Sequence, residues 1–222
     1  MYGGTLPGGG PYKGAMLEEL IIRSLADTLP EAPADAVFLF GQTEDNQASV
    51  LARATNLLEK QQVQQVLFIH SGPISGYPGF ARWQQELRRL GVQEASIAGV
   101  PVPAKTDKLH TLIEAEAMAQ YARAKGHTRI VVSASPFQQP RALMAAVTAA
   151  QRHHPQLYLF SQPGEPLPWS QEATHSQGKV EDTRAGLIAG EMERIQKYHA
   201  KGDLVSVEEM LRYLNRRDKG QL

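Results

Sequence analysis

Residues 36–40 read AVFLF and are followed by Gly41, and this short apolar run decides the fold class. A continuous run without alternating polar positions is typical of a strand that is buried on both faces of a parallel sheet. Further apolar runs, separated by segments with helical spacing, recur at 66–69, 95–100, 130–132 and 157–160. This alternation implies right-handed crossovers and predicts an α/β fold with a doubly wound, mainly parallel five-stranded sheet of the Rossmann-like type.

The segments between and beyond the strands complete the predicted architecture. We expect helices at 16–29, 47–61, 80–90, 108–125, 140–153, 180–200 and 206–215. Ser206 and Glu209 have the spacing of a capping box at the start of the last helix. Residues 162–174 contain three prolines and are expected to form a loop. The predicted parts are a flexible arm (1–14), a Rossmann-like domain (15–176) and a C-terminal helical extension of that domain (177–222).

The composition of the chain narrows the classes of function. Its 222 residues suit one domain, and 23 basic residues are balanced by 23 acidic ones. This balance gives no basic face for nucleic acid and none for an anionic membrane surface. Cysteine is absent, which excludes a disulfide framework and a thiolate nucleophile. With no transmembrane run and no signal-peptide pattern at the start, we expect a cytoplasmic protein.

One apolar stripe in the C-terminal extension has two interpretations. It consists of Leu187, Ile188, Met192, Ile195 and Tyr198. The stripe either packs on the core of its own chain or forms a face for a partner, which leaves a homo-oligomer open.

The predicted sheet fixes where a ligand would bind before any side chain is considered. In open α/β sheets, ligands bind outside the carboxyl ends of the strands, where the strand order reverses. This rule selects the loops 41–47, 71–79, 101–110, 133–139 and 161–176. With a 3-2-1-4-5 order, the loops after the first and fourth strands face each other.

The loop after the fourth strand carries the most informative residues. Ser133, Ser135 and Gln138 precede or begin a helix, whose unpaired N–H groups attract anions. Arg141 lies in the first turn and can clamp a phosphate or a carboxylate with two N–H groups. Alternatively, the serines cap the helix and Arg141 pairs with a neighbouring acid.

The loops after the first and second strands supply further candidate binding residues. Gly41 lets a ligand approach the backbone, and Gln42 follows it, although no GxGxxG fingerprint is present. Arg53, in the next helix, points back toward the cleft or into solvent. Ser71 and Gly72 either cradle an anion or form a plain turn.

Thr111 and Glu114 lie three residues apart and therefore share a helix face. Glu114 is a candidate general base if burial raises its pKa, or else a structural hydrogen-bond acceptor. His70, His110 and His175 fall near strand ends, but without metal-ligand spacing we expect no metal site. No GxSxG elbow and no P-loop occurs, which argues against an α/β-hydrolase and a P-loop NTPase.

Five segments in order resemble the YdcF-like domain family (SanA/ElyC-like domain). They are DAVFLFG at 35–41, Arg53, IHSG at 69–72, Thr111 with Glu114 and Ala115, and SASPFQQPRA at 133–142. The resemblance covers about residues 34–160. It implies a Rossmann-like fold with a cleft at the strand ends, and members mostly of unknown activity. For some members, links to cell-envelope metabolism and to S-adenosylmethionine binding have been suggested.

The chain departs from the family pattern at three of these positions. Gln138 stands where the family has a histidine, Glu114 where it has an asparagine, and Gln42 where it has a second glycine. Losing the histidine removes the most plausible acid or base of a shared reaction. Many members also carry membrane segments, and no such segment occurs here.

These features together predict an anionic small molecule as the ligand. Candidates are a nucleotide, an S-adenosylmethionine-like compound, or a phosphorylated or cell-envelope metabolite. A hydrolase or transferase reaction would use Glu114 as its base. The alternatives are a non-catalytic ligand sensor and an interaction protein.

Overall fold

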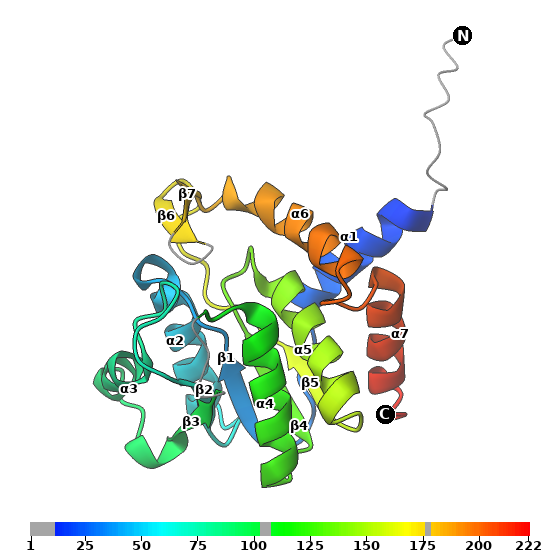
Figure 1. Ribbon diagram of the computed structural model, residues 1–222. Coiled ribbons are helices and arrows are strands. Elements are labelled where there is room, and N and C mark those ends of the chain that lie inside the picture. The colour runs from blue at the N-terminus through cyan, green and yellow to red at the C-terminus, as the bar shows by residue number, and fades with distance from the viewer. Residues whose placement is uncertain (1–11, 103–107, 176–178) are drawn as a thin grey trace.

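The computed structural model describes residues 12–102, 108–175 and 179–222, and it contains the expected parallel sheet (Figure 1). Its strands lie in the order β3-β2-β1-β4-β5, and all four neighbouring pairs are parallel. The strands are β1 (Ala36–Leu39), β2 (Val66–His70), β3 (Ile97–Pro101), β4 (Arg129–Ser133) and β5 (Tyr158–Ser161). The predicted fold class and strand order are therefore confirmed.

Helices cover both faces of the sheet, which explains the continuous apolar runs of the strands. All four residues of β1 are buried, as are those of β4 after Arg129. The crossover helices are α2 (Glu44–Glu59), α3 (Phe80–Arg89), α4 (Thr111–Lys125) and α5 (Gln139–His153). In Figure 1, α4 and α5 lie side by side on the near face. Right-handed crossovers place α2 and α3 on the opposite face.

Three further helices extend the fold beyond the sheet: α1 (Tyr12–Leu25), α6 (Leu187–Ala200) and α7 (Val207–Asp218). α1 begins at Tyr12, so the predicted arm (1–14) is too long; its first eleven residues lie outside the described residues. Buried Arg217 of α7 pairs with Asp27 at 2.6 Å and donates to the Leu159 carbonyl, which ties α7 to the edge strand β5. The capping box of Ser206 is confirmed.

The predicted long helix over 180–200 is wrong in its first third. Val180–Thr183 forms strand β7, which pairs antiparallel with β6 (Glu172–His175), so the expected loop 162–174 also ends early. Buried Arg184 holds the segment against α2 by donating to the Asn46 side chain and to the Asp45 carbonyl. These partners lie more than a hundred residues away in the chain, so local helix propensity is overridden.

The apolar stripe of α6 packs mainly on the chain's own core. Leu187 and Ile195 are buried, while Met192 and Tyr198 are partly buried against the core. Ile188 is 41% exposed and lies at the outer margin of the stripe. Among the described residues, no helix combines the length and the apolar character that a membrane crossing requires.

Candidate functional site

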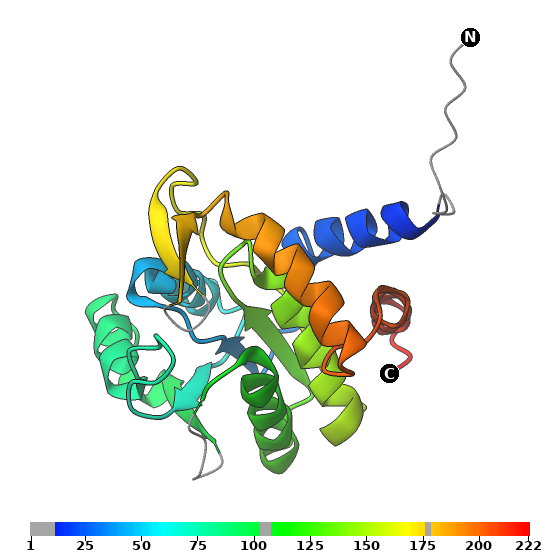
Figure 2. The same ribbon diagram turned by 45° about the horizontal axis from the view of Figure 1, so that its top comes forward.

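A cavity of about 410 Å³ lies at the carboxyl ends of the parallel strands. The segments that follow β1, β2, β3 and β4 contribute to its wall, and we call this part the floor. The hairpin β6–β7 and helix α6 form the opposite wall, the roof, and Figure 2 shows them lying over this edge of the sheet. The described floor residues are Gly41, Gln42, Thr43, Ser75, Tyr77, Leu109, His110, Thr111, Glu114, Gln138 and Arg141. The described roof residues are His175, Lys179, Arg194, Lys197 and Tyr198.

Glu114 is the one carboxylate among the described residues that line the cavity. It sits in the first turn of α4, is only 4% exposed, and accepts a hydrogen bond from the Gly41 N–H at 2.6 Å. Burial raises the pKa of Glu114 to about 7, although the Gly41 N–H and Arg141 act in the opposite direction. The side chain can therefore take up or release a proton near neutral pH.

Gly41 lets Glu114 approach the backbone closely. A Cβ at this position would lie 3.2 Å from Glu114 Oε2 and 3.5 Å from the Tyr77 side chain. Tyr77 donates its hydroxyl to the Ile69 carbonyl at 3.0 Å. Burial, and then the neighbouring Glu114, raise the pKa of Tyr77, so the phenol stays neutral beside the carboxyl group.

Arg141 is held in a fixed orientation by two other elements. Its Nε and Nη2 donate to Glu191 of α6 at 2.5 and 3.2 Å, and its Nη1 donates to Thr111 Oγ1 at 2.6 Å. A guanidinium carries five N–H donors. One N–H on Nη1 and one on Nη2 therefore have no partner among the described residues. Arg141 pairs with an acid, as one interpretation predicted, and still presents donors to the cavity.

Glu191 is the centre of the contacts that join the roof to the floor. It is fully buried and also contacts His175 Nε2 at 2.7 Å and Arg194 Nη1 at 2.9 Å. Burial alone would raise the pKa of Glu191, but Arg141 and His175 outweigh it and lower the value to about 2. Because an ionised carboxylate only accepts hydrogen bonds, Nε2 of His175 must carry the proton.

Gln42 and Gln138 form a neutral network at the base of the cavity. The Gln42 amide nitrogen donates to Gln138 Oε1 at 2.9 Å and to the Phe40 carbonyl at 3.1 Å. The Ser135 hydroxyl donates to Gln42 Oε1 at 2.7 Å. Amide groups do not exchange protons near neutral pH, so this part of the floor positions the loops and cannot act as an acid or base.

Six of the eleven predicted site residues line the cavity, and five do not. Arg53 instead holds the loop after β5, donating to the Pro163 carbonyl at 2.7 Å and pairing with Glu165. The Ser71 hydroxyl donates to the Gly72 carbonyl, and the cavity wall begins a few residues later, at Ser75. The remaining two are Ser133, whose buried hydroxyl has no partner in the described part of the chain, and Ser135 of the glutamine network.

The roof cations were missed by the sequence predictions. Glu191, Arg194 and Lys197 follow one another at intervals of three residues, so each is a neighbour of the next on the surface of α6. This spacing indicates a polar face on the helix, but the sequence analysis considers only the apolar stripe beside it. Lys179 and Lys197 are exposed and form no ion pair with any residue that the structure describes.

Neither a group of metal ligands among the described residues nor a match to a known protein identifies what this cavity binds. Within the described ranges, no group of three or more His, Cys, Asp or Glu side chains could hold a metal ion. No protein-family model matches the chain, and no curated protein matches it. A functional interpretation therefore depends on the residues of the cavity.

Proposed function

We propose that the chain binds an anionic small molecule in this cavity and that Glu114 exchanges a proton with it. One observation carries the proposal: Arg141, Lys179, Arg194 and Lys197 all line the cavity, against the single carboxylate of Glu114 on its described wall.

The helix arrangement adds to the positive potential. Thr43 lies at the N-terminus of α2, Thr111 at that of α4, and Gln138 at that of α5, and all three line the floor. Unpaired N–H groups and the helix dipole favour an anion at such ends. This potential supports the same class of ligand as the four cations.

The chemistry open to the site is acid–base catalysis on the bound anion. A carboxyl group with a pKa of about 7 is half ionised near neutral pH, which suits both proton removal and proton donation. Arg141 would hold the anionic group while Glu114 acts on a neighbouring hydroxyl or water. We therefore place the reaction among hydrolases or transferases.

S-adenosylmethionine fits this cavity poorly. Its ammonium and sulfonium groups outweigh its one carboxylate, so a net cation would face four cationic side chains with only Glu114 in opposition. We therefore assign no role to this cofactor, and the proposal depends on a phosphate or carboxylate ligand.

A non-catalytic sensor is the second candidate, and one observation favours it. Gln138 occupies the position of the family histidine, and its Oε1 is already engaged by Gln42. A site without that histidine can bind its ligand and leave it unchanged. Turnover of the bound compound, lost in Glu114→Gln, supports the enzyme; binding without turnover supports the sensor.

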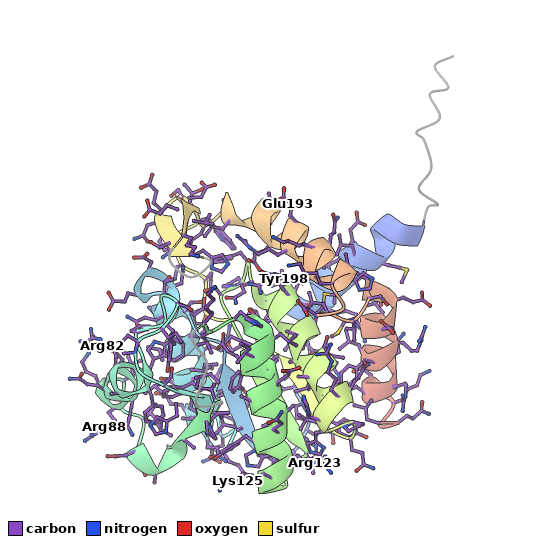
Figure 3. The ribbon with its side chains drawn as sticks, in the orientation of Figure 1. Arg82, Arg88, Arg123, Lys125, Glu193 and Tyr198 are labelled. Carbon is purple, nitrogen blue, oxygen red and sulfur yellow. The ribbon has the colours of Figure 1, made fainter. Side chains whose placement is uncertain are left out.

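The binding claim is tested with a panel of nucleoside monophosphates, sugar phosphates and dicarboxylates, using thermal shift and calorimetry. We expect at least one member to bind, and Lys179→Ala/Lys197→Ala to weaken it by about tenfold or more. Lys125→Ala and Arg88→Ala are matched controls, because neither residue lines the cavity and Figure 3 shows both well away from α6. Absence of binding across the panel, or equal affinity in the double variant, would contradict the proposal.

A further inference from the structure

We infer that the ligand carries its charge as a phosphate monoester dianion, held between Arg141 and the cations of the roof. The inference rests on the proposed function and names the chemical class of the anionic group.

The first argument is the balance of charge. Four cationic side chains line the cavity, and two carboxylates, Glu114 on the wall and Glu191 behind it, oppose them. With Glu114 ionised, as above its pKa of about 7, these groups leave an excess of two positive charges. A monoanion would leave part of this excess uncompensated, whereas a dianion balances it.

The second argument is the direction from which the donors come. Arg141 belongs to α5, Lys179 follows β6, and Lys197 belongs to α6, so three elements contribute. Two N–H groups of Arg141 and both ammonium groups have no partner among the described residues. A phosphate monoester offers three terminal oxygens in a tetrahedral array, and a carboxylate offers two in one plane. Donors from separate elements suit the tetrahedral group better.

The third argument is the uncharged part of the wall. Tyr77 and Leu109 of the floor and Tyr198 of the roof also line the cavity. At about 410 Å³ the cavity lies within the usual range for small-molecule sites. A small organic group bearing one phosphate therefore fits both the volume and the polarity of the wall.

The experiment compares phenyl phosphate with methyl phenyl phosphate by calorimetry at pH 8, in a buffer free of phosphate and sulfate. The two probes share a ring and a phosphorus centre, but the monoester is a dianion at this pH and the diester is a monoanion. We expect the monoester to bind at least about tenfold more tightly. In Lys179→Ala/Lys197→Ala this ratio should fall to a few-fold, and in Lys125→Ala it should stay unchanged.

Phthalate, which places two carboxylates on the same ring, is the third probe and should bind more weakly than phenyl phosphate. Equal affinity for the two esters, or tighter binding of phthalate, overturns the inference that the ligand is a phosphate monoester. If the probes still bind less tightly to Lys179→Ala/Lys197→Ala than to the parent, the proposed anion site stands although this inference fails. If none of the three probes binds, both the inference and the proposed function fail.

Discussion

The floor and the roof of the cavity are held by different kinds of contact. In the floor, neutral groups bridge the loops: fully buried Gln139 accepts the Ala134 N–H at 2.6 Å and donates to the Val132 carbonyl at 2.9 Å and to Ser161 Oγ at 2.7 Å. In the roof, a single ionised side chain, Glu191, contacts Arg141, Arg194 and His175, which come from two helices and the hairpin.

The floor positions the residues of the site, and the roof supplies most of its charge. The floor continues the sheet, so its geometry follows from strand pairing and is reinforced by amide hydrogen bonds. The roof supplies three of the four cations that line the cavity. Its helix α6 is attached to the floor by the charge pairs of Glu191, while Thr43 and Asn46 also hold the hairpin by hydrogen bonds to the Thr174 carbonyl. If the two contributions are independent, substitutions in the floor should change the geometry and stability of the site, and removal of the roof lysines should change its affinity for anions.

The largest effect should come from Glu191→Ala. The substitution leaves Arg141, His175 and Arg194 without their shared carboxylate in a buried setting. Breaking a buried ion pair by removing one partner costs about 3–5 kcal/mol. We expect a loss of this size in the free energy of unfolding, measured by urea denaturation at pH 7.

Glu193→Ala is the matched control on the same helix. Figure 3 shows Glu193 on the outer side of α6, and it is exposed. Its substitution should change the free energy of unfolding by less than about 0.5 kcal/mol. Similar losses from both variants would mean that Glu191 contributes only as a helix residue and does not anchor the roof.

The second effect concerns the floor and depends on pH. The pKa of Glu114 is raised in the folded chain, from 4.5 to about 7. The folded state therefore holds this proton more tightly than the unfolded state, and the stability it contributes is present below pH 4.5 and is lost as the pH rises through 7. Glu114→Gln lacks this loss, so it should be more stable than the parent at pH 8 by on the order of 3 kcal/mol.

The two proteins should differ least at pH 4.5, and their unfolding curves should be compared at both pH values. Glu116→Gln provides the control, since Glu116 lies on the same helix at the surface, paired with Arg152 at 2.9 Å. A stability difference between Glu114→Gln and the parent that does not change with pH would contradict the raised pKa of Glu114.

The floor was largely predictable from the sequence because its signals are local. Each apolar run specifies a buried strand, and the end of each run specifies which residues reach the same edge. Gly41, Glu114 and Arg141 were found in this way. The local pattern does not show which of the polar residues near a strand end reach the cavity. The sequence therefore also predicts Ser133 and Arg53 as binding residues, although Ser133 lies in the core and Arg53 holds the loop after β5.

The roof was not predictable, because its structure depends on contacts between distant segments. The sequence VEDT at 180–183 has no apolar alternation, and only the contacts of Arg184 with Asp45 and Asn46 and the pairing with β6 make it a strand. Glu191 is one of several glutamates in the C-terminal region. Its burial follows from Arg141 and His175, which lie 50 and 16 residues away.

A third variant, Gln139→Leu, tests whether the floor contributes position without contributing charge. It removes the side-chain partner of the Ala134 N–H, whereas the Val132 carbonyl keeps the Gln162 N–H at 3.1 Å. A buried N–H without a partner costs about 2 kcal/mol. We expect a loss of this size in urea denaturation, with little change in affinity for phenyl phosphate. Gln151→Leu, at an exposed position on the same helix, should leave both quantities nearly unchanged.

The smallest effect on the ligand-free protein should come from Lys179→Ala/Lys197→Ala. Both side chains are exposed, and their removal breaks no ion pair with the residues that the structure describes. It also relieves repulsion in a cavity with excess positive charge, so we expect the free energy of unfolding to stay constant or to rise by less than about 0.5 kcal/mol. Any rise should disappear in high salt, because salt screens exposed charges. A clear loss of stability would show that these lysines hold the roof in place, whereas constant stability with weakened anion binding would show that they serve the ligand.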